Sequence, residues 1–269
     1  MSLSPLGTAL VTGASSGIGA IYANRLADRG HDLILVARNR GKLAGLAAQI
    51  ADRTGRSVEV VAADLGDKAD RRAVETVLAT DASITMLVNN AGVGATAPLL
   101  SADVDAMERM IDLDVTALMR LTYAAAPAFV ARGRGTIVNI ASIVAIGPEI
   151  LNGVYGGAKA FVLALTQSLH HELAAKGLRV QAVLPGATAT DFWGTAGTPV
   201  EHLPGEIVMP AAAMVDAALA GLDAGELVTI PALPDAAQWH AYEAARQAML
   251  PNLSRSEPAA RYRVAPLSA

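Results

Sequence analysis

The sequence predicts an α/β fold, in which a doubly wound parallel sheet of about seven strands is covered by helices on both faces. Two observations lead to this expectation. Short apolar runs rich in Val, Ile and Leu alternate along the chain with longer amphipathic segments. Most of these runs are continuous, which is typical of strands buried on both faces. The length of 269 residues suits one large domain of this class.

Each expected strand is an apolar run that precedes a helical segment. The strands are expected at 9–12, 32–37, 58–62, 86–89, 135–140, 179–184 and 227–230, and the helices at 18–29, 40–53, 68–80, 103–131, 153–176 and 211–223. Strands that alternate with helices imply a parallel sheet. Ligands of such sheets bind beyond the carboxyl ends of the strands, and every motif described below falls there or on the helix that follows.

The chain contains no evident linker, repeat or low-complexity tract, so we expect residues 1–269 to form a single domain. Segment 191–210 is long and rich in Gly and Pro, and such segments often form lids, so we expect a substrate lid there. Residues 231–269 form a C-terminal extension that we expect to be helical at 235–250.

Composition excludes several classes of function. The chain has no cysteine, which excludes disulfides, thiolate chemistry and cysteine-based zinc sites, and we expect no metal site. A net charge of −4 does not favour nucleic acid as a partner. We find neither a signal peptide nor an apolar run long enough to cross a membrane, so we expect a cytoplasmic protein with no membrane partner.

The segment from Thr12 to Gly19 reads T-G-A-S-S-G-I-G and connects the first expected strand to the first helix. Glycines in such a turn allow the backbone to bend sharply and to approach a pyrophosphate closely. The amino terminus of the following helix then offers free N–H groups and a positive dipole end to the anion. The pattern therefore predicts a dinucleotide site at this turn.

Tyr155 and Lys159 are four residues apart and share one face of the helix expected at 153–176. A nearby ammonium favours the phenolate and lowers the pKa of the phenol. Such a phenol can protonate a carbonyl oxygen or deprotonate an alcohol near neutral pH.

Taken together, these motifs resemble the short-chain dehydrogenase/reductase family of nicotinamide-dependent oxidoreductases. The motifs are T-G-x-x-x-G-x-G at 12–19, N-N-A-G at 89–92, Ser142, Y-x-x-x-K at 155–159 and P-G at 185–186. The resemblance extends from residue 6 to about residue 230 and implies a Rossmann-type fold. It also implies a homodimer or homotetramer formed through the long helices at 103–131 and 153–176.

The resemblance implies a role for each catalytic residue. Tyr155 would be the general acid for carbonyl reduction or the base for alcohol oxidation, and the cofactor would supply the hydride. Ser142 would hydrogen-bond the substrate oxygen. Lys159 would bind the nicotinamide ribose and lower the pKa of Tyr155, and Asn89 would help to shape the cofactor wall. Besides Tyr155 and Lys159, the implied cofactor contacts are Gly13, Ser15, Ser16, Gly17, Ile18, Gly19, Asp64, Leu65, Asn90, Ala91, Gly92, Pro185, Gly186, Thr188 and Thr190.

The residues after the second expected strand indicate the choice of cofactor. A site for NAD(H) usually has an acidic residue at this strand end, whereas this chain has Ala37 followed by Arg38. A guanidinium suits a phosphate, so we predict that Arg38 binds the 2′-phosphate and that NADP(H) is preferred over NAD(H). The competing interpretation is that Arg38 and Arg40 are ordinary solvated loop charges.

One position departs from the family pattern. Asp114 occupies the place on the long helix where the family usually has an asparagine that helps to hold a water linking the lysine to solvent. A carboxylate there could accept the same hydrogen bond and would raise the pKa of Lys159. Asp114 therefore either serves the catalytic relay with an altered pH dependence or marks a weakened or lost enzymatic function. We favour the first interpretation because Ser142, Tyr155 and Lys159 are all present.

The residues flanking the catalytic set are mostly apolar, which predicts a ketone, aldehyde or secondary alcohol with a hydrophobic body. The predicted substrate contacts are Val144, Glu149, Asn152, Phe192 and Trp193, with Val93, Ile143 and Ile146 nearby. Glu149 either faces solvent or recognises a polar group. The alternative functions are a non-catalytic NADP(H)-sensing or interaction protein of the same fold and, ranked last, an epimerase or dehydratase, since such relatives are usually longer.

Overall fold

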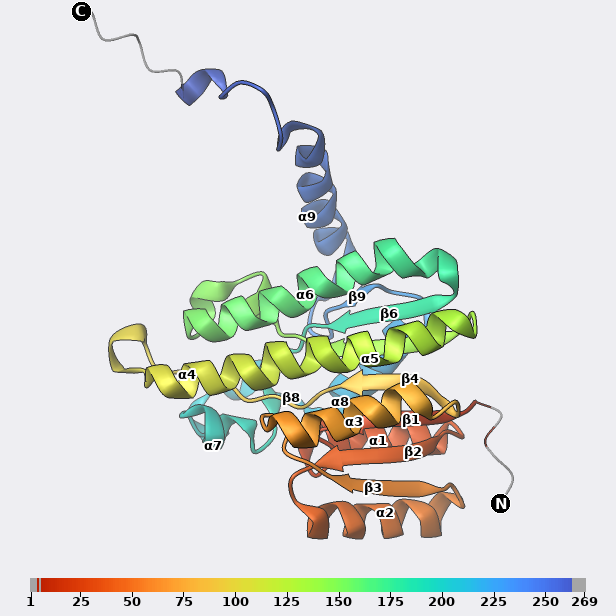
Figure 1. Cartoon of the computed structure of the whole chain (residues 1–269). Coiled ribbons are helices and arrows are strands. Elements are labelled where there is room, and N and C mark those ends of the chain that lie inside the picture. The colour runs from red at the N-terminus through yellow and green to blue at the C-terminus, as the bar shows by residue number, and fades with distance from the viewer. Residues whose placement is uncertain (1–3, 5, 263–269) are drawn as a thin grey trace, which may run out of the picture. The chain divides into compact units, whose positions relative to one another are not determined.

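The computed structural model describes residue 4 and residues 6–262, and the chain divides into two compact units that meet between Ala232 and Leu233. The first unit contains a parallel seven-stranded sheet with the order β3-β2-β1-β4-β5-β6-β9 (Figure 1). The strands are β1 (Thr8–Thr12), β2 (Asp32–Ala37), β3 (Val58–Ala62), β4 (Ile84–Asn89), β5 (Gly135–Ile140), β6 (Leu178–Val183) and β9 (Val228–Thr229). This arrangement confirms the predicted fold class.

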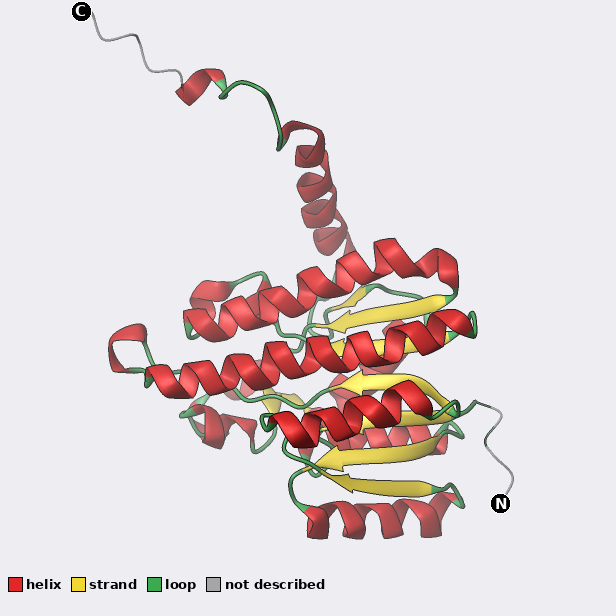
Figure 2. Ribbon diagram, in the orientation of Figure 1, coloured by secondary structure: helices red, strands yellow, loops and turns green. Residues whose placement is uncertain are grey.

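Helices cover both faces of the sheet (Figure 2). The core on one face joins the sheet to α1 (Gly17–Asp28), α2 (Arg40–Thr54) and α8 (Ala211–Asp223). The core on the other face joins it to α3 (Lys68–Thr80), α5 (Leu118–Ala131) and α6 (Gly153–Leu173). The strands in the middle of the sheet are therefore enclosed by apolar side chains on both sides, as their continuous apolar sequences require.

Polar side chains define where the helices begin. Asn39 caps α2 by accepting a hydrogen bond from the amide of Lys42, and Asp67 caps α3 in the same way. Asn152 caps α6 by accepting from the amides of Val154 and Tyr155. These caps satisfy backbone donors that have no partner inside the helix, and they explain why the predicted helix starts agree closely with the observed ones.

The helix expected at 103–131 differs from the prediction, because it is not one regular helix. It consists of α4 (Val104–Ile111), the π-helical segment η2 (Asp112–Ala117) and α5. A π-helical segment inserts extra backbone into a helical turn and rotates the side chains at that point. Here the segment contains Asp114, whose carboxylate is fully buried at 0% side-chain exposure.

The carboxyl ends of the strands form one edge of the sheet, and the strand order changes direction there between β1 and β4. In Figure 1 the short helix α7 (Phe192–Ala196) and the start of α4 lie beyond the arrowheads on this side. The segment expected to be an irregular lid contains α7 and two 3₁₀ turns, and it ends in a strand that forms a small parallel pair, β7 (Thr188–Ala189) with β8 (Met209–Pro210).

The second unit contains α9 (Ala236–Met249), close to the helix expected at 235–250. Asp235 caps it, and the rings of Trp239 and Tyr242 stack with their centroids 5.3 Å apart. Throughout the described residues, no helix combines the length and the apolar character needed to cross a membrane.

Two glycines with left-handed backbones give a test of the packing between loops. Gly55 has φ of 68° and no atom within 4 Å of the position that a Cβ would occupy, whereas a Cβ on Gly177, at φ of 85°, would collide with the carbonyl of Gly133. We expect Gly55→Ala to lower the free energy of unfolding by about 1 kcal/mol because of its backbone conformation alone. Gly177→Ala should cost a further ~1–3 kcal/mol from overpacking. Urea denaturation of both variants measures the difference, and equal losses would contradict the predicted collision.

Candidate active site

The glycine-rich turn after β1 has the geometry of an anion cradle. Gly13 and Gly17 have φ values of 65° and 53°, which favour glycine strongly. At Gly19 a Cβ would lie 2.5 Å from the Asn90 amide nitrogen, so the start of α1 packs directly against the residues after β4. Backbone conformation therefore favours glycine at positions 13 and 17, and the close approach of the neighbouring segment favours glycine at position 19.

Thr12 and Asn90 lock this turn to the end of β4. The Thr12 hydroxyl accepts hydrogen bonds from the amides of Asn90 and Ala91 at 2.9 and 3.0 Å. In return, the Asn90 side chain donates to the Thr12 carbonyl at 2.9 Å. Thr12 was expected only as the start of the motif, and its role in joining the two loops was not predicted. The signal that could have indicated this role is a hydroxyl one residue before the first glycine.

The amino terminus of α1 leaves backbone donors for a ligand. In the part of the chain that the structure describes, the N-cap residue Ser16 makes no side-chain capping hydrogen bond. Thr190 lies beside this turn, since its Cγ2 is 3.2 Å from the position that a Cβ on Gly17 would take. The residues on both sides of the turn thus fit a pyrophosphate bound at the helix end.

Arg38 follows the carboxyl end of β2, close to the glycine turn, because the Ala14 amide donates to the Val36 carbonyl at 3.3 Å. The Arg38 side chain is exposed and has no ion pair or hydrogen bond among the described residues. A free guanidinium at the carboxyl end of β2 fits a 2′-phosphate.

The predicted adenine contacts follow β3. Leu65 is buried and its carbonyl accepts a hydrogen bond from Arg71 at 3.0 Å, while the Asp64 carboxylate accepts a hydrogen bond from the Gly66 amide.

Asn89 is placed differently from the prediction. Its side chain points into the interior and donates to Thr122 at 3.1 Å and to Asn139 at 2.9 Å. Asn139 in turn donates to Thr166 on α6. Asn89 therefore links β4 and β5 to the covering helices, and its side chain is not available to shape the cofactor wall.

Three of the four predicted catalytic residues lie together after β5 and on the first turns of α6. Ser142, Tyr155 and Lys159 are all buried. The Lys159 ammonium lies 5.6 Å from the centroid of the Tyr155 ring and donates to the Ile140 carbonyl at 3.3 Å. The Ser142 hydroxyl donates weakly to the Pro185 carbonyl at 3.5 Å, which places Pro185 and Gly186 beside the same site.

Asp114 joins this cluster directly. Its Oδ2 lies 3.0 Å from the Lys159 Nζ in a fully buried ion pair, and its Oδ1 accepts a hydrogen bond from the Val93 amide at 2.9 Å. A Cβ on Gly92 would lie 3.0 Å from the same carboxylate, so the loop after β4 approaches it closely. The carboxylate thus contacts both the catalytic lysine and the loop that follows N-N-A-G.

The charges in the cluster affect one another. Burial raises the pKa of Tyr155 above its ordinary value; Lys159 opposes this, and the negative charge of Asp114 adds to it. Lys159 lowers the pKa of Tyr155, as expected. Burial raises that pKa by more, so the expectation that the phenol pKa lies below its ordinary value was wrong. Burial acts to lower the pKa of Lys159, yet Asp114 and Tyr155 keep that pKa raised, as predicted for Asp114.

The predicted substrate residues divide into two groups. Val144 is buried in a cluster with Tyr155, and the Phe192 ring packs on that cluster with its centroid 6.0 Å from the centroid of Tyr155. Trp193 is also buried, and its indole N–H donates to the Thr188 carbonyl at 3.0 Å.

The other two predicted substrate residues have different surroundings. The Asn152 side chain is used by its cap on α6 and by a 2.6 Å hydrogen bond to the Ala97 carbonyl. Glu149 is exposed to solvent, which is one of the two interpretations that the sequence left open. Contact of either side chain with a substrate stays a prediction.

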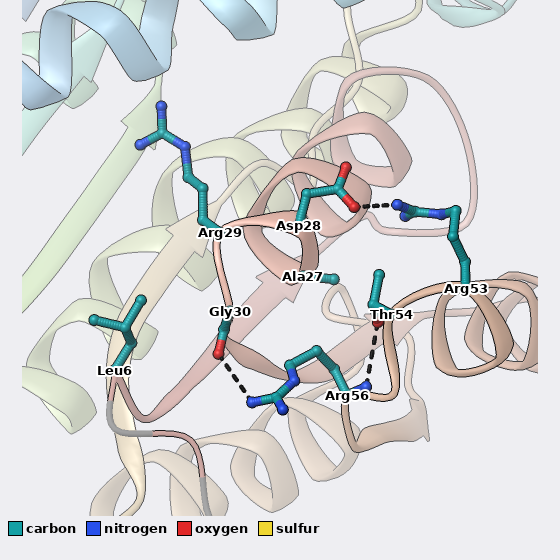
Figure 3. A pocket seen from close by; sticks show the side chains of 8 residues that line it. All are labelled: Leu6, Ala27, Asp28, Arg29, Gly30, Arg53, Thr54 and Arg56. Atoms are coloured by element: carbon teal, nitrogen blue, oxygen red, sulfur yellow. Dashed lines mark hydrogen bonds and ion pairs between the residues drawn. The ribbon is translucent and has the colours of Figure 1, made fainter.

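A separate cavity of about 560 Å³ lies at the opposite edge of the sheet, where β1, β2 and β3 begin. Three arginines line it, and Figure 3 shows Arg53 meeting Asp28 and Arg56 reaching the Gly30 carbonyl. The third, Arg29, forms two hydrogen bonds to Asp223 at 2.9 Å. Arg53 and Arg29 thus have carboxylate partners, and the Arg56 guanidinium lies 4.0 Å from the carboxylate of Asp32. The residues that line the cavity include none of the predicted catalytic residues.

Comparison with known proteins adds four findings. The family model described as short chain dehydrogenase matches residues 7–200. The chain is 34% identical over 191 residues to a very-long-chain 3-oxoacyl-CoA reductase of Anas platyrhynchos, and the match covers 68% of this chain and 60% of that enzyme. The chain thus spans less than two thirds of this curated relative.

Two solved structures match nearly the whole chain. A short-chain dehydrogenase from Sphingobium yanoikuyae in complex with NADPH is 50% identical, with a TM-score of 0.93, and the match covers 96% of this chain and 100% of that one. The bulky-bulky ketone specific alcohol dehydrogenase from Comamonas testosteroni is 43% identical, with a TM-score of 0.88, over 95% and 98% of the two chains.

The position of Asp114 predicts an unusual pH dependence. Because its charge raises the pKa of Tyr155, Asp114→Asn should lower that pKa, and the rising limb of alcohol oxidation, which requires the phenolate, should move to lower pH. Activity at the new optimum should fall by far less than the about 10²–10⁴-fold that removal of an acid–base group causes.

The pH profile of kcat/KM for alcohol oxidation measures this effect. Asp112→Asn is the matched control, because Asp112 is an exposed carboxylate in the same π-helical segment. An unshifted profile in Asp114→Asn would show that the carboxylate does not influence Tyr155, and a large loss at every pH would assign it a more specific role.

Proposed function

Because the chain belongs to the short-chain dehydrogenase family, we propose that it is an NADP(H)-dependent oxidoreductase that interconverts a hydrophobic ketone or aldehyde and the corresponding alcohol. The observation that carries this proposal is the buried cluster of Ser142, Tyr155, Lys159 and Asp114. It lies at the same edge of the sheet as the glycine turn after β1, because the strands that precede both features are parallel.

The residues of the cluster perform distinct tasks. In reduction, Tyr155 donates its phenolic proton to the carbonyl oxygen as that oxygen becomes an alcohol, and its raised pKa keeps the proton available. Ser142 donates a hydrogen bond to the same oxygen and fixes its position. Lys159 stabilises the phenolate that remains, and Asp114 holds the ammonium in place through the 3.0 Å ion pair. The bound nicotinamide supplies or accepts the hydride.

The preference for NADP(H) is supported by Arg38 and by a relative. Arg38 is exposed directly after β2, and Ala37 stands at the strand end where an acidic residue would favour NAD(H). The similar structure from Sphingobium yanoikuyae is a complex with NADPH. Gly13, Gly17 and the open amino terminus of α1 would hold the pyrophosphate, and Lys159 would bind the nicotinamide ribose.

The apolar surroundings of Tyr155 support a hydrophobic substrate. Ala95, Met110 and Val144 are buried in one apolar cluster with Tyr155, and Val93 and Phe192 pack on that cluster. The relative from Comamonas testosteroni is a bulky-bulky ketone specific alcohol dehydrogenase, which supports a bulky ketone for this chain as well.

Two further parts of the proposal concern assembly and location. Val104 and Ile111 on α4 and Tyr123 on α5 are exposed apolar residues of the long helical unit that, together with α6, would form a homodimer or homotetramer. The cytoplasmic location stays a prediction of the sequence. The lid at 191–210 also stays a prediction, which the contact of Phe192 with Tyr155 supports.

The proposed chemistry predicts the effect of removing one oxygen atom. Tyr155→Phe should lower kcat for ketone reduction by about 10²–10⁴-fold, because it removes the proton donor and leaves the ring packing intact. The loss of NADPH absorbance with a panel of hydrophobic ketones, aldehydes and diketones measures turnover, and fluorescence measures NADPH binding. Tight NADPH binding by a wild-type protein that turns over none of them would favour the non-catalytic NADP(H)-binding protein instead.

The role of Arg38 predicts a selective loss of affinity. Arg38→Ala should weaken binding of NADPH by about 10–100-fold, the range expected for charge-assisted hydrogen bonds to a phosphate, and should leave NADH binding nearly unchanged. Arg40→Ala, which removes the same charge two residues later, should have a smaller effect. Titration of both variants with both cofactors measures this, and an unchanged preference in Arg38→Ala would assign Arg38 to the solvated loop.

A further inference from the structure

The ring of Phe192 stands beside the catalytic tyrosine. Phe192 is the first residue of α7, and its ring is inclined by 44° to that of Tyr155 at a centroid distance of 6.0 Å. The same ring lies 5.7 Å from the ring of Trp193 in an edge-to-face arrangement. Tyr155 is only 5% exposed and belongs to the apolar cluster on which Phe192 packs, so a substrate that reaches the phenol comes close to the Phe192 ring.

Gly94 provides the space in which this ring lies. A Cβ on Gly94 would lie 2.8 Å from Cε2 and 3.0 Å from Cε1 of Phe192, and closer still to Cζ. Real side chains do not approach so closely, so any other residue at position 94 would force the ring to move. Gly94, the first glycine after N-N-A-G, is therefore matched to Phe192 in the predicted lid, almost 100 residues away in the sequence.

Hydrogen bonds fix the ring relative to the phenol from two sides. Thr96, two residues after Gly94, donates to the Ala196 carbonyl at the end of α7 through both its amide and its hydroxyl, at 3.0 and 2.9 Å. Ala97 accepts from Asn152, the cap of the helix that contains Tyr155, at 2.6 Å. The loop at 93–97 thus connects α7 to the start of α6.

We propose that Gly94 and Phe192 act together as the specificity-determining pair of the site, so that the Phe192 ring offers an aromatic face to one substituent of the carbonyl substrate. This inference rests on the proposed carbonyl reduction and names its substrate class, ketones with an aryl group next to the carbonyl. Aromatic rings pack on one another more favourably than saturated rings of the same size, by roughly two- to tenfold in affinity.

A matched pair of substrates tests this preference. Acetophenone and cyclohexyl methyl ketone share a methyl group and differ in the ring, which is aromatic and conjugated with the carbonyl in the first and saturated in the second. The ratio of kcat/KM for acetophenone to that for cyclohexyl methyl ketone should fall by roughly two- to tenfold from the wild type to Phe192→Leu, which keeps an apolar side chain and removes the aromatic face. Comparing this ratio between the variant and the wild type cancels the ordinary difference in reactivity between the two ketones.

Gly94→Ala should lower the same ratio by displacing the ring, and the double variant Gly94→Ala/Phe192→Leu should be no worse than the lower single variant, because both changes act through one ring. Gly45→Ala is the control: Gly45 lies in α2 with no atom within 4 Å of its Cβ position, and its ratio should equal that of the wild type. Circular dichroism and NADPH binding verify that each variant is folded.

The outcomes separate this inference from the proposed function. Turnover of both ketones with a ratio that is unchanged in Phe192→Leu and Gly94→Ala would overturn the specificity pair and leave the reductase proposal standing. Equal losses for both substrates, with additive effects in the double variant, would also overturn it by showing that the residues only support the fold. Absence of turnover of every carbonyl compound by a wild type that binds NADPH would overturn both.

Discussion

The buried carboxylate of Asp114 makes contacts on which the arrangement of the site depends. It accepts a hydrogen bond from the Val93 amide and forms a 3.0 Å ion pair with Lys159, which is itself buried beside Tyr155. A buried carboxylate is costly unless its charge and its lone pairs are satisfied, so the ion pair constrains the π-helical segment, the loop after β4 and helix α6 to one relative position. The same charge opposes the effect of Lys159 on the phenol and helps to keep Tyr155 protonated, which suits a proton donor.

The loop after β4 passes this constraint on to the rest of the site. Gly92 approaches Asp114 closely, and Gly94 contains no side chain that would displace Phe192. Thr96 then binds the end of α7, and Ala97 accepts a hydrogen bond from the cap of α6. A few consecutive residues therefore connect the ion pair, the predicted lid and the catalytic helix. A side chain at Gly92 would crowd the Asp114 carboxylate, and one at Gly94 would displace Phe192.

The fold, the glycine turn and the shared helix face of Tyr155 and Lys159 could be predicted from the sequence because each depends on a local pattern. Continuous apolar runs located the seven strands, the glycine turn joins two consecutive elements, and Tyr155 and Lys159 lie on one helix. The interruption of the long helix at 112–117, the inward turn of Asn89 and the hydrogen bond from Asn152 to the Ala97 carbonyl could not be predicted in this way, because each is decided by partners distant in sequence. The raised pKa of Tyr155 belongs to the same class, since it follows from burial by residues of several elements.

The most direct test of the account follows the hydride itself. NADPH with deuterium in place of both hydrogens at the reduced carbon of the nicotinamide would be incubated with the protein and a ketone that it turns over, and the alcohol would be analysed by mass spectrometry. The account predicts one deuterium per alcohol molecule, attached to the former carbonyl carbon. An alcohol without deuterium, or a ketone that is transformed while the cofactor keeps its label, would contradict it.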